Sequence, residues 1–268
     1  MSNRVRVIHV MSPLIGLSEK IKGQLNGLDV QVKTLPTSWA CPEDEEGDVI
    51  EYLVGWIRNV VEFLSCPGNK VRWAQTTSAG VDYFFKNIDK LQLAPGFQHT
   101  RTNFIQRGQM MAEYVIGQIL SRERNFQASW EAQKKCSYDK KCAPPYRMLT
   151  ELTVGILGVG ELGGEVARFC KSFGMQVWAG VTDRRFQSGE SPSPYVDHVR
   201  PMSRLPEVLE QSDYLVTVLP STPETRGLLS GDVLQPCRVR KTVLINLGRG
   251  DLIDEESLVQ AIRWIKIF

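Results

Sequence analysis

The 268-residue sequence lacks several features that would place it in a specialised class of protein. It has no apolar stretch long enough to cross a bilayer, so we expect no transmembrane helix. Its 32 Lys and Arg residues nearly balance its 30 Asp and Glu residues, which leaves a formal net charge of +2. Such a charge gives no reason to expect a nucleic acid or an acidic membrane surface as partner.

Cysteine is sparse, and its spacing points to no special chemistry. The six cysteines form no C-x-x-C pair and no group with metal-ligand spacing: Cys41, Cys66, Cys136, Cys142, Cys170 and Cys237. We therefore expect reduced, structural thiols and no metal site. Residues 4–10 have the pattern of a β-strand rather than of a signal peptide. Together these features predict a cytoplasmic protein.

The sequence does contain a glycine-rich turn between a predicted strand, 153–157, and a predicted helix, 162–173. In this G-x-G-x-x-G spacing, Gly158 permits the tight turn, Gly160 lets a pyrophosphate approach the backbone, and Gly163 lets helix and strand pack closely. The phosphates then lie at a helix N-terminus, which favours negative charge. The competing interpretation, that the glycines only tighten a turn, does not account for the apolar helical face and the strand that follow.

Strands and helices alternate through the rest of the chain, which predicts α/β architecture with parallel sheets. The first series has strands at 4–10, 29–33, 52–54 and 71–75 and helices at 18–25 and 56–64. A helix at 110–124 and a polar connector at 124–145 precede the second series. That series has strands at 153–157, 176–181, 214–219 and 242–246, helices at 162–173 and near 206–210, and a last helix capped by Asp254. We divide the chain into domains at 1–108 and 109–268.

The loop after the predicted strand 176–181 bears on the choice of cofactor. NAD-binding sites usually place an acidic residue at the end of the second strand, to bind the ribose 2′-hydroxyl. Here that position is Val181 or Thr182, and Arg184 and Arg185 follow. Arginine suits a 2′-phosphate, so the loop favours NADP over NAD. The alternative is that Asp183 is the ribose acid and the arginines are merely solvated.

Arg249 stands between two glycines directly after the predicted strand 242–246. Packing explains an arginine poorly at such a place. Its planar guanidinium would suit a carboxylate or a polarised carbonyl, and ligands of open α/β sheets bind beyond the carboxyl ends of the strands.

Five motifs, which cover nearly the whole chain in order, resemble the D-isomer-specific 2-hydroxyacid dehydrogenases, and most of all their glyoxylate/hydroxypyruvate reductase branch. They are TTSAGVD at 76–82, MAEYVIG at 111–117, TVGILGVGELG at 153–163, LPSTPETRGLL at 219–229 and NLGRGDLIDEESL at 246–258. The resemblance implies two doubly wound parallel-sheet domains, a flavodoxin-like substrate domain and a Rossmann NAD(P)-binding domain. It also implies reduction of a small 2-oxo acid by hydride from NADP or NAD, and a homodimer formed through the region of helix 110–124.

The resemblance further assigns residues to roles. The backbone N–H groups of Ser78, Ala79 and Gly80 would hold the substrate carboxylate, and Arg249 would bind and polarise the 2-oxo acid. The implied cofactor contacts are Gly158, Gly160, Glu161, Leu162, Gly163, Thr182, Arg184, Arg185, Leu219, Pro220, Thr225, Leu247 and Gly248.

The sequence departs from the family pattern after Ile262. The family's proton-donating histidine and its partner glutamate would follow a further strand, whereas here the sequence changes to RWIKIF. For His9, His99 and His198 the motifs favour structural roles. We therefore expect a Rossmann sheet without its last strand or strands, with strand 242–246 left at an edge. Two functions stay open: a reductase, or a truncated, inactive relative that at most binds nucleotide or a partner. A third, a non-enzymatic NAD-sensing protein, has no supporting motif.

Overall fold

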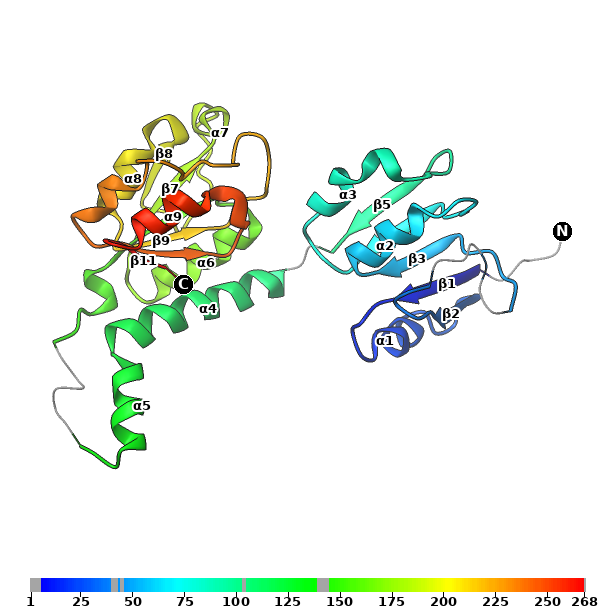
Figure 1. Cartoon of the computed structure of the whole chain (residues 1–268), viewed down its shortest axis with the longest axis horizontal. Helices are drawn as coiled ribbons and strands as arrows, with labels where there is room; N and C mark the ends of the chain where they lie inside the picture. Colours follow the sequence, from blue (N-terminus) through cyan, green and yellow to red (C-terminus); the bar gives the residue numbers. More distant parts are fainter. Residues whose placement is uncertain (1–5, 40–42, 44–45, 103–104, 139–144, 268) are drawn as a thin grey trace. The chain divides into compact units, whose positions relative to one another are not determined.

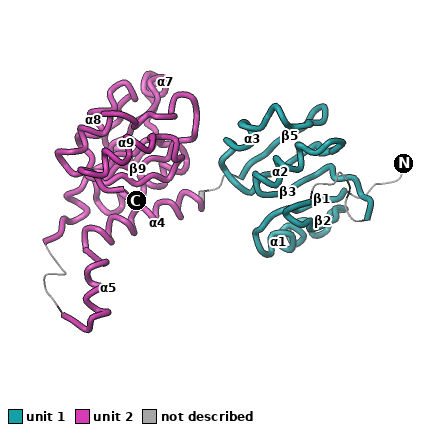
Figure 2. The backbone as a smooth tube through the Cα atoms, in the orientation of Figure 1, with its two compact units in different colours: residues 1–103 teal, residues 104–268 magenta. Residues whose placement is uncertain are grey.

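Strands and helices alternate along both halves of the chain, as the sequence predicts (Figure 1). The computed structural model describes residues 6–39, 43, 46–102, 105–138 and 145–267. Two compact units divide the chain, unit 1 from Met1 to Asn103 and unit 2 from Phe104 to Phe268 (Figure 2). The boundary between the units lies after Asn103, five residues before the boundary after position 108 that the sequence predicts.

Unit 1 contains one sheet of five parallel strands in the order β2-β1-β3-β4-β5. The strands are β1 (Arg6–Met11), β2 (Val30–Thr34), β3 (Tyr52–Gly55), β4 (Trp73–Thr76) and β5 (Gln98–Arg101). This is the flavodoxin-like order of a doubly wound sheet. The carboxyl ends of all five strands lie at one edge of the sheet, because every pairing is parallel.

The helices of unit 1 are α1 (Leu17–Gln24), α2 (Ile57–Leu64) and α3 (Asp82–Lys86). α1 packs Leu17 and Ile21 against a cluster that contains Val10 and Val54. α2 contributes to a second cluster, in which its Val60 and Phe63 accompany Met11, Leu53 and Ala74 of the sheet. Neighbouring residues of β1 and β3 alternate between the two clusters, so helices cover both faces of the sheet.

Unit 2 contains a sheet of six parallel strands in the order β11-β10-β9-β6-β7-β8. The strands are β6 (Thr153–Leu157), β7 (Gln176–Val181), β8 (His198–Pro201), β9 (Tyr214–Thr217), β10 (Val243–Asn246) and β11 (Lys266–Ile267). Counted within the unit, this is the strand order of a Rossmann fold, with the crossover between β6 and β9. The predicted fold class is confirmed.

The expectation that this sheet lacks its last strand is wrong. β11 pairs with β10, with Lys266 opposite Val243 and Ile267 opposite Leu244, so β10 is not an edge strand. The sequence change after Ile262 concealed β11, because two paired residues are too few to show the alternation of a strand. The packing supplies what the pattern lacks: Ile265 is buried and Ile267 lies against the same apolar cluster.

The helices of unit 2 are α4 (Ile105–Glu123), α5 (Phe126–Lys134), α6 (Glu161–Ser172), α7 (Asp183–Gln187), α8 (Leu205–Gln211) and α9 (Glu255–Ala261). α4 and α6 join one core cluster with Tyr214 and Val216 of β9. α8 and α9 join another with Leu215. Adjacent residues of β9 thus face opposite layers, and all four residues of the strand are buried, as expected in a parallel sheet covered on both faces.

Besides β11, the helices α3, α5 and α7 and the strands β5 and β8 are absent from the sequence-based prediction. The predicted polar connector at 124–145 contains α5, whose apolar residues Phe126 and Trp130 are exposed and so give no amphipathic signal; its stretch 139–144 lies outside the described residues. β5 and β8 were missed because both are edge strands with mostly exposed or half-buried residues, which show no apolar alternation.

Among the described residues, Cys136, Cys170 and Cys237 are free thiols, and the Cys66 thiol donates to the carbonyl oxygen of Glu62 at 3.4 Å. Burial raises the pKa of the Cys170 thiol to about 12 and that of Cys237 to about 11, so both stay protonated and act as small apolar side chains. Cys41 and Cys142 lie outside the described residues. Among the described residues, no helix is both long and apolar enough to cross a membrane, and no group of three His, Cys, Asp or Glu could hold a metal ion.

Candidate functional site

The glycine turn joins β6 to α6 at the carboxyl edge of the unit 2 sheet. Gly158 has φ of 95°, a backbone conformation that favours glycine. A Cβ atom built on Gly163 would lie 2.1 Å from the carbonyl oxygen of Gly158, so only glycine lets α6 approach the turn this closely. Gly160 differs from both, because a Cβ atom there would have no neighbour within 4 Å.

This geometry fits a bound dinucleotide. Gly160 is the N-cap of α6, no side chain caps the helix there, and the residue is exposed. The turn therefore offers backbone N–H groups, the positive end of the helix dipole and open space at the same point. Glu161 and Leu162, which follow in the first turn of α6, are exposed and half-buried respectively.

The loop after β7 lies beside the glycine turn and begins α7. Thr182 is the N-cap of α7, and its Oγ1 accepts a hydrogen bond from the backbone N–H of Arg185 at 3.4 Å. The Arg185 guanidinium donates to the carbonyl oxygen of Val159, within the glycine turn, at 2.6 Å. Arg184 is exposed. Asp183 accepts a hydrogen bond from the Ser203 hydroxyl, which gives its carboxylate a structural partner.

The loops after β9 and β10 converge on Leu219. A Cβ atom on Gly158 would lie 2.9 Å from a methyl carbon of Leu219, and one on Gly248 would lie 2.6 Å from the Leu219 carbonyl oxygen. The Thr225 hydroxyl closes the first of these loops, donating to the Pro220 carbonyl oxygen at 2.6 Å. The second loop begins with Leu247, whose N–H donates to the carbonyl oxygen of Thr217 at 2.9 Å. The glycine turn, Leu219 and Gly248 thus lie close together.

Arg249 follows Gly248 in a loop that hydrogen bonds of the Asn246 side chain hold in place. The Asn246 amide group donates to the Arg249 carbonyl oxygen at 3.0 Å, and its Oδ1 accepts from the Gly248 N–H at 3.0 Å. The Thr217 hydroxyl on the neighbouring strand donates to the same Oδ1 at 2.8 Å. Arg249 itself is half-buried, and one guanidinium nitrogen donates to the Gly248 carbonyl oxygen at 3.2 Å.

The predicted substrate loop, Ser78–Ala79–Gly80, follows β4 in unit 1. Ser78 is buried, and its carbonyl oxygen accepts from the Thr76 hydroxyl at 3.3 Å. Arg101, at the end of β5, donates from its guanidinium to the Ala79 carbonyl oxygen at 2.9 Å. A cation beside this loop makes the local potential more positive, which suits a carboxylate.

His99 lies next to the same loop, yet its contacts are those of a structural residue. Its ring stacks on Phe84 at a centroid distance of 4.6 Å, and Nε2 lies 3.2 Å from the Thr76 hydroxyl. Burial, and then the charge of Arg101, lower the pKa of His99, so the ring is neutral at pH 7. His198 begins β8 and packs against Trp178 at the amino-terminal edge of the unit 2 sheet.

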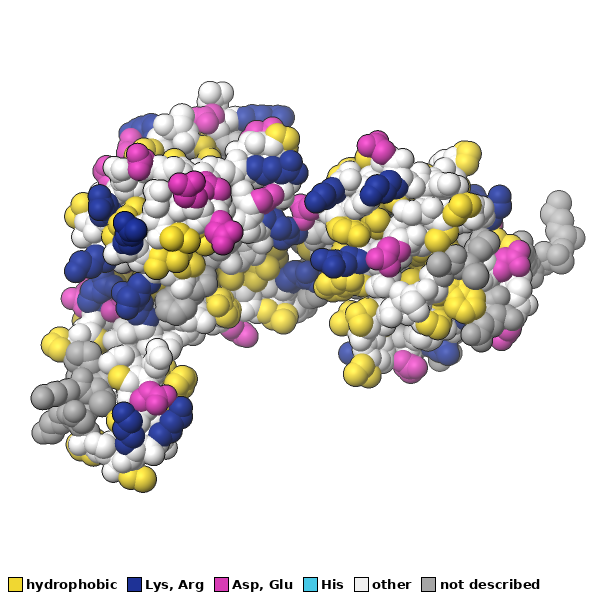
Figure 3. Space-filling view, viewed as in Figure 1, with side chains coloured by type: hydrophobic (Ala, Val, Ile, Leu, Met, Phe, Trp, Pro, Cys, Tyr) yellow, Lys and Arg dark blue, Asp and Glu magenta, His cyan; other side chains and the backbone are white. Residues whose placement is uncertain are grey.

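Within unit 2, the fold therefore brings the predicted cofactor residues and Arg249 to one edge of one sheet. The predicted substrate loop belongs to unit 1. The sequence-based prediction missed Asn246 and Arg101. A polar residue at the end of the buried strand VLIN, and an isolated arginine closing β5, were the available signals. Figure 3 shows acidic and basic side chains interspersed over the visible face of both units, in keeping with the small net charge.

Comparison with protein families identifies the domain that carries this edge. The family model described as "D-isomer specific 2-hydroxyacid dehydrogenase, NAD binding domain" matches residues 116–268. The human protein named glyoxylate reductase/hydroxypyruvate reductase is 33% identical over 141 residues, which are 52% of this chain and 38% of that protein. The chain thus spans less than two fifths of the length of this relative.

Solved structures resemble the chain over nearly its whole length. A D-isomer specific 2-hydroxyacid dehydrogenase family protein from Aeromonas salmonicida subsp. salmonicida A449 covers 98% of the chain with a TM-score of 0.81 and 27% identity, over 79% of its own length. A second, from Xanthobacter autotrophicus Py2 in complex with NADPH and MES, covers 96% with a TM-score of 0.70 and 25% identity, over 76% of its own length.

Proposed function

The chain belongs to the D-isomer specific 2-hydroxyacid dehydrogenases, a family of NAD(P)-dependent enzymes, and from this we propose that it reduces a small 2-oxo acid of the glyoxylate or hydroxypyruvate type to the D-2-hydroxy acid. The observation that carries the proposal is the position of Arg249. Its loop lies at the same sheet edge as the glycine turn, and Leu219 contacts both.

In this proposal the cofactor residues are those at the carboxyl edge of the unit 2 sheet. Gly158, Gly160 and Gly163 shape the phosphate site, and the loop from Thr182 to Arg185 lies at the adenosine end. An arginine in this loop favours NADP over NAD. When bound, the reduced nicotinamide supplies a hydride for C2 of the 2-oxo acid.

The chain's own residues bind and polarise the substrate. The guanidinium of Arg249 pairs with the 2-oxo acid and stabilises the negative charge that develops on the C2 oxygen as the hydride arrives. The N–H groups of Ser78, Ala79 and Gly80 hold the carboxylate, with Arg101 behind them. One proton must reach the C2 oxygen for the hydroxyl to form, so the reaction consumes one hydride and one proton.

A second candidate, nucleotide or partner binding without turnover, is favoured by the position of the histidines. His198 is the one histidine of the unit 2 sequence, and it lies at the sheet edge opposite Arg249. His99 in unit 1 is stacked on Phe84 and neutral. Within the described part of unit 2, no histidine lies at the sheet edge that carries Arg249.

We also propose a homodimer, for which the exposed aromatic side chains of α4 and α5 give support. Tyr114, Phe126 and Trp130 are 46%, 40% and 58% exposed, and the last two rings lie 6.2 Å apart.

NADPH oxidation by the purified chain, with glyoxylate and then hydroxypyruvate, tests the proposal. We expect turnover that Arg249→Ala reduces by about 10²-fold or more, because it removes the charge that stabilises the C2 oxygen. Arg263→Ala, an exposed arginine after α9, is the matched control and should leave turnover unchanged. Cofactor binding without turnover in the unmodified chain would contradict the reductase and support the second candidate.

A further inference from the structure

Arg184 and Arg185 are adjacent in the sequence but occupy different surroundings. Arg185 is half-buried, and its guanidinium donates to two backbone carbonyl oxygens, that of Val159 at 2.6 Å and that of Pro192 at 3.3 Å. Both acceptors are neutral backbone groups, so neither contact offsets the positive charge of the guanidinium beside the glycine turn. Arg184 is exposed at the surface of α7.

The contact with Val159 fixes a peptide group of the phosphate site. The Val159 carbonyl and the Gly160 N–H belong to the same planar trans peptide, in which the two groups point in opposite directions. A donor that holds the carbonyl therefore also sets the direction of the N–H. That N–H belongs to the N-cap of α6, at the residue whose Cβ position is open.

The second contact ties the turn to a distant loop. Pro192 lies in the Ser/Pro-rich segment between α7 and β8, and the Arg185 guanidinium joins it to Val159. The backbone N–H of Arg185 is itself held by the Thr182 hydroxyl. Arg185 is thus held by hydrogen bonds from its backbone N–H and from both terminal nitrogens of its guanidinium. This is the contact pattern of a structural arginine.

We propose that Arg185 is a positioning residue, which aims the Gly160 N–H at the cofactor pyrophosphate, and that Arg184 alone reads the 2′-phosphate. This inference rests on the proposed cofactor site. It assigns the two arginines to separate energetic roles: Arg185 supports NADP and NAD equally, because both contain the pyrophosphate, whereas Arg184 acts only on the cofactor that carries the additional phosphate.

The test is to titrate NADPH and NADH separately into the 268-residue chain, following the quenching of tryptophan fluorescence. We expect Arg185→Ala to weaken both cofactors by about tenfold and to leave the ratio of their Kd values unchanged, since a charge-assisted hydrogen bond orients a group common to both. Arg184→Ala should weaken NADPH by about tenfold and leave NADH unchanged. Arg263→Ala is the control, with no expected effect on either.

A circular dichroism spectrum and a thermal melt check that each variant is folded. If Arg185→Ala does not fold, Arg185→Lys replaces it, because lysine keeps one donor within reach of the Val159 carbonyl; it should retain part of the affinity for both cofactors in equal proportion. Loss of NADPH affinity alone in an Arg185 variant would overturn the inference and leave the proposed function standing. An unmodified chain that binds neither cofactor would overturn both.

Discussion

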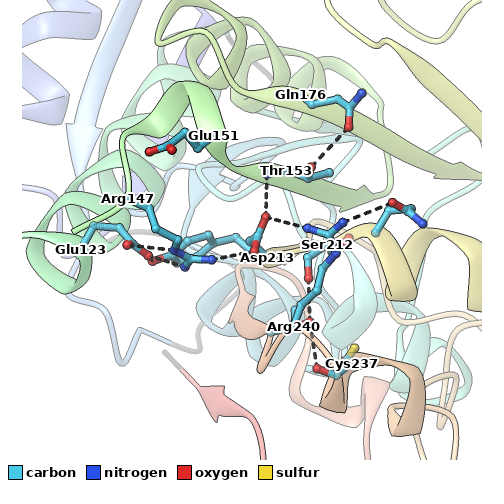
Figure 4. A network of polar contacts seen from close by, with 12 residues as sticks. Glu123, Arg147, Glu151, Thr153, Gln176, Ser212, Asp213, Cys237 and Arg240 are labelled. Carbon is cyan, nitrogen blue, oxygen red and sulfur yellow. Dashed lines mark hydrogen bonds and ion pairs between the residues drawn. The ribbon is translucent and has the colours of Figure 1, made fainter. Parts of the chain in front are cut away.

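Arg147 and Asp213 stand 66 positions apart in the sequence, yet Nη1 of Arg147 lies 2.7 Å from Oδ1 of Asp213. The same guanidinium reaches Glu123, with Nη2 2.6 Å from Oε1, and the Tyr214 hydroxyl donates to that oxygen at 2.7 Å (Figure 4). The carboxylate side chains of Glu123 and Asp213 are only 7% and 5% exposed. One arginine therefore joins the end of α4 to the start of β9, at the sheet edge opposite the proposed cofactor site.

This network predicts a pH-dependent contribution to stability. Burial on its own raises the pKa of Glu123, but hydrogen bonds from Arg147 and Tyr214 outweigh it and hold that pKa below its usual value. A carboxyl whose pKa is lower in the folded state stabilises the protein above its unfolded pKa of about 4.3, and the contribution is lost as the pH falls through the folded pKa. We expect Glu123→Gln to lower the free energy of unfolding by about 1–3 kcal/mol at pH 7.

Urea denaturation at pH 7 and at pH 3.5 checks this prediction. The difference in the free energy of unfolding between the unmodified chain and the Glu123→Gln variant should be smaller at pH 3.5 than at pH 7. Glu131→Gln is the matched control, because Glu131 pairs with Lys134 on the exposed surface of α5, and it should cost about 0.5 kcal/mol or less. Equal effects of the two substitutions at pH 7 would contradict the assignment.

Asn246 should position Arg249 for substrate binding without contacting the substrate itself. Asn246→Ala removes the hydrogen bonds to the Gly248 N–H and the Arg249 carbonyl, so the backbone of Arg249 is no longer held in place. We expect kcat/KM for hydroxypyruvate to fall by about 10- to 100-fold, as a misplaced binding group does, while the Kd of NADPH stays the same. Thr217→Val removes one of the bonds to Asn246 and should have a smaller effect in the same direction. Unchanged kinetics in both variants would show that the loop holds its shape without the amide.

The glycine turn predicts opposite outcomes at two neighbouring positions. Gly163→Ala forces a Cβ atom against the Gly158 carbonyl, and we expect it to cost about 1–3 kcal/mol of stability as an overpacked contact. Gly160→Ala places its Cβ in open space, so the protein should remain stable but bind NADPH more weakly. Thermal melts with and without NADPH distinguish the two. A Gly160→Ala variant with undiminished NADPH affinity would argue against a phosphate at this point.

The proposed dimer should depend on the aromatic residues of α5. Replacing Trp130 with Gln removes the most exposed aromatic side chain of that helix, and we expect the protein to sediment as a monomer at concentrations where the unmodified chain sediments as a dimer. Ile262→Gln, at an exposed position after α9, is the control and should leave sedimentation unchanged. A chain that is monomeric before any substitution would refute the dimer.

The elements that the sequence predicts well are those whose own residues carry the signal. β6, the turn and α6 follow from a buried apolar run, three spaced glycines and a helical apolar face, and both parallel sheets follow from the alternation of strands and helices. Asp254 was expected as an N-cap, and its carboxylate accepts from the Ser257 N–H at 2.8 Å.

The elements that escaped prediction depend on partners distant in the sequence. β5, β8 and β11 become strands by pairing at or near the sheet edges, and their own residues are mostly polar or too few. The proposed role of Arg185 depends on a carbonyl 26 positions away, and the contact between Arg147 and Asp213 spans 66 positions. Such contacts leave no local pattern in the sequence, because each partner is a single residue of a common type and its neighbours in the chain do not indicate what it will contact.

Every strand of the first sheet comes from the stretch 6–101, and every strand of the second from 153–267. Among the described residues, neither sheet takes a strand from the other unit. A cut between residues 103 and 104 would therefore leave both sheets whole. Each half could be produced in its own culture, one of them enriched in ¹⁵N, and the two joined by ligation, so that NMR reports on the nucleotide half alone within the complete chain.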